Sequence, residues 1–273
     1  GLLATASKAM GFVAIIRVLI GITLPVEGEA FWFIIIALIS VITMTWGNLA
    51  ALTSDNPKRM LAYSSVAHAG YMLAGLAAIG SGIASIAATK LILTAIVFHL
   101  AVLVLFKFGA FLVLSLLETE GRSHRLEDLH GLGKREPLIA GSMFVFMLSL
   151  AGVPPLAGFL SKFLMINGIV NASVASGSTG SVSVIGWMET VDPVFWLAIA
   201  IVLNSALSVF YYLRIGLVMF FEAPETNNPL KSATSLRLAI TACALLTVIL
   251  GFTSLGDSVL DIVSNAVETF IGN

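Results

Sequence analysis

Five basic side chains stand inside long apolar stretches of this sequence and are the residues best suited to chemistry: Lys8, His68, His99, Lys107 and Lys162. A charged side chain at the centre of a bilayer costs at least about 2.5–3.5 kcal/mol on insertion scales, so such residues usually serve a function. Burial disfavours the charged form of lysine and lowers its pKa from about 10.4, whereas arginine stays charged. Lysine and histidine can therefore take up and release a proton inside a membrane. We interpret the five residues as a candidate proton path.

The alternative interpretation of these residues is structural. A buried lysine can be satisfied by backbone carbonyls that a helix break leaves free, and a single buried histidine is often a hydrogen-bonded core residue. Spacing favours a relay for two of the five. His99 and Lys107 are eight residues apart, about two helical turns, so they should project near one stripe of the same helix.

The stretch "SLAGVPPLAGFLSKF" at 149–163 predicts a broken helix in front of Lys162. Two adjacent prolines remove two backbone donors and clash with the preceding turn, so carbonyls around Ser149–Gly152 lose their partners. Lipid would not tolerate free carbonyls, but a polar cavity inside a helix bundle would. Discontinuous helices of this kind mark ion sites in transporters. The residues that define the expected break are Gly152, Pro154, Pro155 and Gly158.

Three further cations lie close to the ends of apolar stretches. Arg17 and Lys90 are near outer ends and Arg214 is near an inner end, where long side chains can reach the membrane interface. Carboxylates are placed differently, because all fifteen Asp and Glu residues fall in connections, at span ends or in the C-terminal tail.

The composition identifies an integral membrane protein. Of the 273 residues, 58% are hydrophobic and 11% are charged, whereas a soluble domain carries about 25% charged residues. The net charge of −1 gives no indication of nucleic-acid binding. A single cysteine, Cys243, excludes an intrachain disulfide and argues against a metal cluster, and we expect no metal and no cofactor in this chain.

The expected fold is an all-α membrane protein with seven transmembrane helices, since about 20 apolar residues cross a bilayer. The candidate spans are at roughly 1–21, 30–53, 59–80, 82–117, 137–171, 193–221 and 233–255. Segment 172–188 is rich in Ser and Gly and predicts a mobile outer loop. In the tail at 256–273, acidic residues share one helical face and Val and Phe share another, which favours an interfacial amphipathic helix.

The connections alternate in charge and so predict the orientation. Basic residues gather in or beside every second connection: Lys58, Arg59, Arg122, Arg125, Lys134, Arg135, Lys231 and Arg237. Segments 22–29, 172–192 and 256–273 contain no lysine or arginine. By the positive-inside rule the basic connections face the cytoplasm, so the C-terminus should lie outside.

Five motifs in order carry a resemblance to a known family: "LATASKA" (3–9), "NPKRMLAYSSVAHAGYM" (56–72), "FKFGAF" (106–111), "MLSLAGVPPLAGFLSKF" (147–163) and "VLNSALSVFYYLRI" (202–215). Together they resemble the antiporter-like membrane subunits of respiratory complex I. The likeness is closest to the N-type subunit, the equivalent of mitochondrial subunit 2, and it extends over essentially the whole chain.

The resemblance implies a domain arrangement. The family has fourteen spans built from two inverted five-span repeats, and this chain looks like the last seven. Residues 1–21 would be the last helix of the first repeat, 30–221 the second repeat with a break at 150–156, 233–255 the final span and 256–273 an outer tail. Because Gly1 begins at once in apolar sequence, we expect the chain to be a fragment. The preceding half would then supply a membrane glutamate.

The resemblance also implies roles for individual residues. Lys8 matches the central lysine of the eighth span, Lys107 a lysine of the eleventh span in sister subunits, and Lys162 the lysine of the broken twelfth span. Some sister subunits carry a second histidine between the position of His99 and that of Lys107. Here that place is Leu103, so we expect the relay to pass through water.

These implications predict a proton-translocating subunit of a complex that oxidises NADH or a related donor and reduces quinone. The chain would be a non-redox part of this translocase, with other membrane and hydrophilic subunits as partners, lipid around it, quinone bound elsewhere and no nucleic acid. The expected location is the bacterial plasma membrane, with an organelle inner membrane as the alternative. Two other functions stay open: a subunit of a multi-subunit sodium/proton antiporter, and a structural membrane subunit that does not pump.

Overall fold

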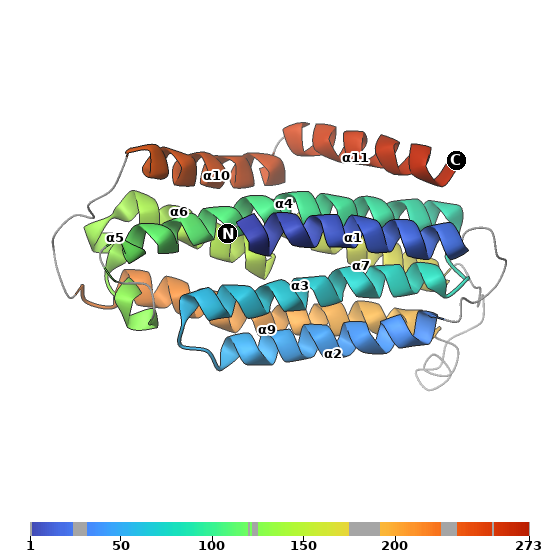
Figure 1. Ribbon diagram of the computed structural model, residues 1–273, viewed down its shortest axis with the longest axis horizontal. Helices are drawn as coiled ribbons and strands as arrows, with labels where there is room; N and C mark the ends of the chain where they lie inside the picture. Colours follow the sequence, from blue (N-terminus) through green and yellow to red (C-terminus); the bar gives the residue numbers. More distant parts are fainter. Residues whose placement is uncertain are drawn as a thin grey trace.

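The computed structural model describes residues 2–23, 32–119, 121, 125–174, 192–224, 234–252 and 254–272, and this part of the chain is helical without strands. The long helices run nearly parallel to one axis of the molecule (Figure 1). They are α1 (Leu2–Thr23), α2 (Phe33–Leu52), α3 (Pro57–Gly80), α4 (Ile86–Glu118), α6 (Pro137–Ala151), α7 (Ala157–Val174), α9 (Pro193–Phe221), α10 (Thr234–Phe252) and α11 (Ser254–Gly272). Two short turns, η1 (Leu126–Leu129) and α5 (Leu132–Arg135), lie between α4 and α6. The expected outer loop at 172–188 falls mostly outside the described residues.

Four of the described helices are long and apolar enough to cross a membrane by length and composition, namely α2, α4, α9 and α10. Helix α1 has 22 residues. The apolar run at 137–171 is divided into α6 and α7, of 15 and 18 residues. Helix α3 has 24 residues, but its inward face carries serine, histidine and tyrosine, which lower its mean hydropathy.

Helix starts follow from capping residues in the sequence. The Asn56 side chain accepts hydrogen bonds from the backbone N–H groups of Lys58 (2.9 Å) and Arg59 (3.1 Å), and Pro57 occupies the first helical position of α3. Asp192 caps α9 in the same manner, with Pro193 next to it. Such caps satisfy amide groups that a helix leaves without partners at its N-terminus.

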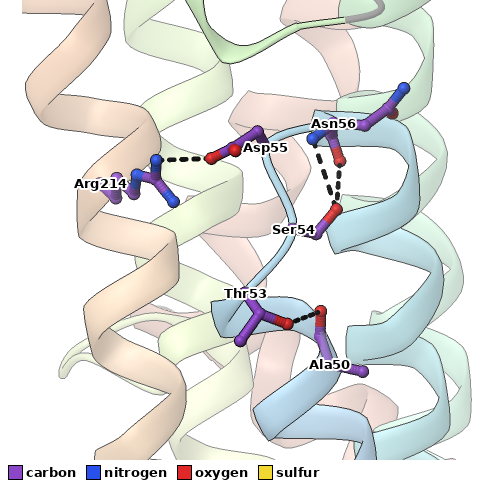
Figure 2. Close-up of polar contacts among 6 residues, drawn as sticks. All are labelled: Ala50, Thr53, Ser54, Asp55, Asn56 and Arg214. Carbon is purple, nitrogen blue, oxygen red and sulfur yellow. Dashed lines mark hydrogen bonds and ion pairs between the residues drawn. The ribbon is translucent and has the colours of Figure 1, made fainter.

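Figure 2 shows the corner between α2 and α3, where Asp55 reaches across to α9. Its carboxylate lies 2.7 Å from the Arg214 guanidinium. Arg214 therefore extends to a polar end of the bundle, and the ion pair ties α9 to the α2–α3 corner.

Helices α2 and α3 approach each other through glycines. A Cβ atom built on Gly47 would lie 2.6 Å from the backbone N of Ala67, and one built on Gly70 would lie 2.6 Å from the backbone N of Met44. Small residues at such contacts let two membrane helices pack backbone to backbone. Polar side chains on α3 and α9 are thereby held at fixed positions beside α2.

Helices α10 and α11 lie end to end along one side of the bundle, both next to α4 (Figure 1). At its start, α10 is fixed to α6 by a two-pronged ion pair between Arg237 and the buried Glu136, with distances of 2.8 and 2.6 Å. The amphipathic helix expected in the tail is present as α11. Its apolar face packs on the bundle, where Val267 is buried, and Glu268 pairs with Lys90 of α4 at 2.6 Å.

Candidate functional site

The centre of the site is the interruption between α6 and α7. Helix α6 ends at Ala151 and α7 begins at Ala157. Gly152 closes α6 with a φ of +84°, a left-handed conformation that glycine adopts without strain. The irregular backbone therefore lies where the adjacent prolines predict it.

Lys162 binds the carbonyls that this interruption leaves free. In a continuous helix the carbonyls of Leu150 and Ala151 would accept hydrogen bonds from residues 154 and 155, but both of these are prolines without an N–H. The ammonium of Lys162 donates to these two carbonyls instead, at 2.9 and 3.2 Å. Its residue is only 5% exposed and makes no ion pair within the described part of the chain.

Lys107 lies in a continuous helix and is held differently. It is fully buried on α4, and its ammonium donates to the Leu61 carbonyl (2.9 Å) and to the hydroxyls of Ser64 (2.5 Å) and Ser65 (2.7 Å). All three oxygens belong to α3. This neighbouring helix therefore supplies the polar surroundings that α4 lacks.

A pair of histidines lies between α3 and α4. Nδ1 of His68 is 3.0 Å from Nε2 of His99, and the two rings stack with their centroids 5.1 Å apart. The outer nitrogens of the pair have partners as well, since Nδ1 of His99 is 2.8 Å from Ser161 Oγ and Nε2 of His68 is 3.3 Å from the Tyr212 hydroxyl. Each of these side chains is buried. The histidines thus join α3, α4, α7 and α9 through hydrogen bonds.

A second buried polar group adjoins the histidines. The Asn48 amide nitrogen donates to the Tyr71 hydroxyl (3.1 Å) and to the Asn204 side-chain oxygen (3.1 Å), while Tyr211 donates to the Asn48 oxygen (3.0 Å). Tyr71 connects this group to the site, because its ring lies 5.4 Å from the Lys162 ammonium and packs edge-on against His68.

The structure thus brings four of the five basic candidates into one buried region. His99 and Lys107 share α4, and Leu103 lies between them, 8% exposed. A proton passing between His99 and Lys107 would move beside α3, where Ser65 contacts Lys107 and His68 contacts His99. The side chain of Lys8 lies outside the described residues.

Sequence reasoning missed the partners of these residues, although α3 carries a signal. Its polar residues Ser65, His68 and Tyr71 recur every three positions and Ser64 lies four before His68, which places them on one helical face. A polar stripe of this kind in an apolar helix indicates the face that contacts other polar groups. The partners Tyr212 and Ser161 come from distant helices and give no comparable local pattern.

The cations expected at polar edges differ from this group. Arg17 is exposed, Lys90 pairs with Glu268, and Arg214 pairs with Asp55. Among the described residues no group of three or more His, Cys, Asp or Glu side chains is placed to hold a metal ion.

An all-helical membrane protein with a discontinuous helix and buried lysines has the features of an ion-translocating subunit. Residues 1–187 match the model of the NADH:quinone oxidoreductase/Mrp antiporter transmembrane family. The chain therefore belongs to this family, and the antiporter-like expectation from the sequence is confirmed.

Individual relatives agree with this assignment. NADH-quinone oxidoreductase subunit N of Heliobacterium modesticaldum is 34% identical over 92% of this chain and 47% of its own length, and subunit N of Trichlorobacter lovleyi is 41% identical over 80% and 39%. The chain spans about half or less of the length of these relatives.

Solved structures show the same fold. One chain of respiratory complex I from Thermus thermophilus superposes with a TM-score of 0.62 and 34% identity, covering 83% of this chain and 44% of that one. A chain of the Mrp complex from Dietzia sp. gives a TM-score of 0.66 at 24% identity, covering 87% and 47%. The second likeness concerns the fold alone.

Proposed function

We propose that this chain is part of a proton-translocating membrane subunit of a complex that reduces quinone with electrons from NADH or a related donor. The observation that carries the proposal is the buried group of Lys107 with Ser65, His68 with His99, and Lys162 with its carbonyl partners. Lysine and histidine in such a row can exchange protons, whereas the redox chemistry would take place in other subunits.

Each residue has a defined task in this proposal. Lys8, Lys107 and Lys162 hold protons in turn, and His68 and His99 pass them between α3, α4 and α7. The break at Gly152, Pro154, Pro155 and Gly158 supplies carbonyl oxygens for a charged Lys162. Neutral lysine donates more weakly to these oxygens, because hydrogen bonds from charged groups are about twice as strong.

We also propose how the helices span the membrane and which way the chain is oriented. The helices α1 to α10 would form seven spans, α6 and α7 together counting as one, with the second inverted repeat running from α2 to α9. The C-terminus would lie on the outer side of a bacterial plasma membrane, and other subunits of the complex would cover part of the bundle. The names of the relatives support a quinone-reducing complex.

A subunit of a multi-subunit sodium/proton antiporter is the second candidate, favoured by the likeness to the Mrp complex. The higher identity to subunit N of quinone oxidoreductases supports the first candidate. Genes for hydrophilic iron–sulfur subunits beside this one would further support it, and their absence would favour the antiporter.

Substitution of Lys162 tests the proposal in the complete subunit within its assembled complex. Lys162→Ala removes the proton carrier, and Lys162→Arg keeps a cation that cannot release its proton. We expect both to lower quinone reduction and the acidification of sealed vesicles by at least about 10-fold, in the range of a lost acid–base group. Lys90→Ala, which alters a half-exposed lysine, should leave both rates near wild type.

Two results would contradict the proposal. Full pumping by an assembled Lys162→Ala complex would remove Lys162 from the path. Full activity of Lys162→Arg alone would show that only the positive charge beside the break matters. Subunit content must be measured in parallel, because removing a buried charge can also impair assembly.

A further inference from the structure

Four buried side chains from four helices form one continuous hydrogen-bonded row across the bundle. Tyr212 of α9 contacts His68 of α3 (3.3 Å), His68 contacts His99 of α4 (3.0 Å), and His99 contacts Ser161 of α7 (2.8 Å). None of the four is more than 1% exposed. Each contact joins two groups that can both donate and accept a hydrogen bond, which is the requirement for passing protons along a row.

The Ser161 hydroxyl has two acceptors for its single proton. One is the Gly158 carbonyl of its own helix at 3.0 Å, and the other is Nδ1 of His99 at 2.8 Å. A hydroxyl can donate to only one of them at a time. Its orientation therefore decides whether Ser161 accepts from His99 or donates to it.

This choice sets the direction of every bond in the row. When Ser161 donates to Gly158, neutral His99 must donate from Nδ1 to Ser161, His68 from Nδ1 to His99, and Tyr212 from its hydroxyl to His68. When Ser161 donates to His99, each neutral histidine must instead carry its proton on Nε2, and His68 donates to Tyr212. Both arrangements satisfy all three contacts, and a mixed arrangement would leave two donors or two acceptors facing each other.

We propose that Tyr212 and Ser161 are the two ends of a proton wire that passes one proton and must then be reset, an inference that rests on the proposed function. In the first arrangement a proton arriving at the Tyr212 oxygen drives one transfer across each of the three contacts. The original Tyr212 proton moves to His68 Nε2, the His68 proton to His99 Nε2, and the His99 proton to Ser161 Oγ. Ser161 gives up its original proton to the next acceptor of the proposed path, a neutral Lys162, so one proton enters at Tyr212 and one leaves at Ser161.

The transfer leaves the row in the second arrangement. No further proton can follow in the same direction, because every donor now points back toward Tyr212. The row is restored by reorientation of the rings and hydroxyls or by a proton that travels the other way. A wire of this kind conducts in single steps and does not leak continuously.

The test uses Ser161→Ala, Tyr212→Phe and the double variant in the complete complex, with quinone reduction and vesicle acidification as readouts. Each single variant removes one end of the wire, so we expect coupled turnover to fall at least about 10-fold. The double variant should be no slower than either single one, because a wire cut at one end is already closed. Ser161→Thr, which keeps the hydroxyl, should restore most of the turnover.

Matched controls separate the wire from simple loss of a hydrogen bond. Ser40→Ala removes a buried serine of α2 that donates to the Ala37 carbonyl at 2.7 Å. Thr247→Val removes a buried hydroxyl of α10 that donates to the Cys243 carbonyl at 2.7 Å. Both controls should keep turnover within about 2-fold of wild type, since each hydroxyl bonds a backbone carbonyl of its own helix and no residue of the row.

Each remaining outcome has a defined meaning. Normal turnover in assembled Ser161→Ala and Tyr212→Phe complexes, with Lys162→Ala still impaired, would overturn the wire and leave the proposed function standing. Losses that multiply in the double variant would also overturn the wire, because they indicate two independent sites. If Ser161→Ala fails to assemble, Tyr212→Phe decides alone against the Thr247→Val control. Normal turnover in Lys162→Ala as well would reject the proposed function itself.

Discussion

Lys107 and Lys162 are two buried lysines of one bundle that obtain their hydrogen-bond acceptors in opposite ways. Lys107 lies in an unbroken helix and donates to three oxygens of another helix, two of them serine hydroxyls. Lys162 of α7 donates to two backbone carbonyls at the C-terminal end of α6, on the other side of the helix break. Two of the three acceptors at the first site are side-chain hydroxyls, whereas both acceptors at the second site are backbone carbonyls.

The difference shows what each site loses when its lysine is removed. Ser64 and Ser65 also donate to the Leu61 carbonyl, so they keep hydrogen bonds without Lys107. Within the described part of the chain the carbonyls of Leu150 and Ala151 have no such second partner, because the prolines that follow cannot donate. Lys162 should therefore contribute more to the stability of the bundle than Lys107.

Replacing each lysine by methionine tests this contrast directly. Lys162→Met leaves two buried carbonyls unpaired, each at a cost of about 1–3 kcal/mol, so we expect the complex to lose about 2–6 kcal/mol of stability. Lys107→Met should cost clearly less. Thermal release of the subunit from the purified complex measures both, and equal losses would show that the break does not depend on Lys162.

A smaller effect should follow from closing the space beside the break. A Cβ atom added to Gly158 would overlap the Ser149 carbonyl oxygen, and Gly158 N–H bonds the Ser149 hydroxyl at 3.2 Å. We expect Gly158→Ala to destabilise the subunit by about 1–3 kcal/mol through overpacking. The control Gly141→Ala lies in α6 with no atom within 4 Å of the new Cβ, and it should be neutral or slightly stabilising. The same melting experiment compares them, and indistinguishable melting of the two variants would refute the close approach.

The smallest effect is expected at the half-exposed lysine of α4. Lys90 pairs with Glu268 at 2.6 Å, but the side chains are 34% and 66% exposed. Such pairs contribute about 0–1 kcal/mol, so Lys90→Ala should shift melting little, and less still in high salt. A loss of stability as large as that of Lys162→Met would mean that burial does not determine how much a lysine contributes to the stability of this bundle.

Much of the site could be predicted from local sequence. The apolar stretches, the adjacent prolines and the buried lysines each depend on neighbours in the chain, so the membrane class and the position of the break follow from them. The contacts of His68 could not be predicted in this way. They depend on how α3 is rotated against α4 and α9, and the rotation against α4 is set by packing such as that of Gly75 on Ile92 and Ile96.

The relay expected between His99 and Lys107 illustrates the same limit. Counting residues along one helix placed these two near one stripe and suggested water beside Leu103. The structure adds α3 to this step, because Ser65 and His68 lie one turn apart and contact Lys107 and His99 respectively. A periodicity within one helix carries no information about which other helix faces it.

The contact between α10 and the break has a consequence for the order in which the protein is made. Gly251 lies against the backbone of Pro155 and Ala157, so that α10 covers the interruption. At about 5–20 residues per second the ribosome reaches Gly251 roughly 5–20 s after Pro155. During synthesis the break is therefore without the cover of α10 for this interval. Lys162 is synthesised only a few residues after the break, so its ammonium can bind the Leu150 and Ala151 carbonyls before α10 is made.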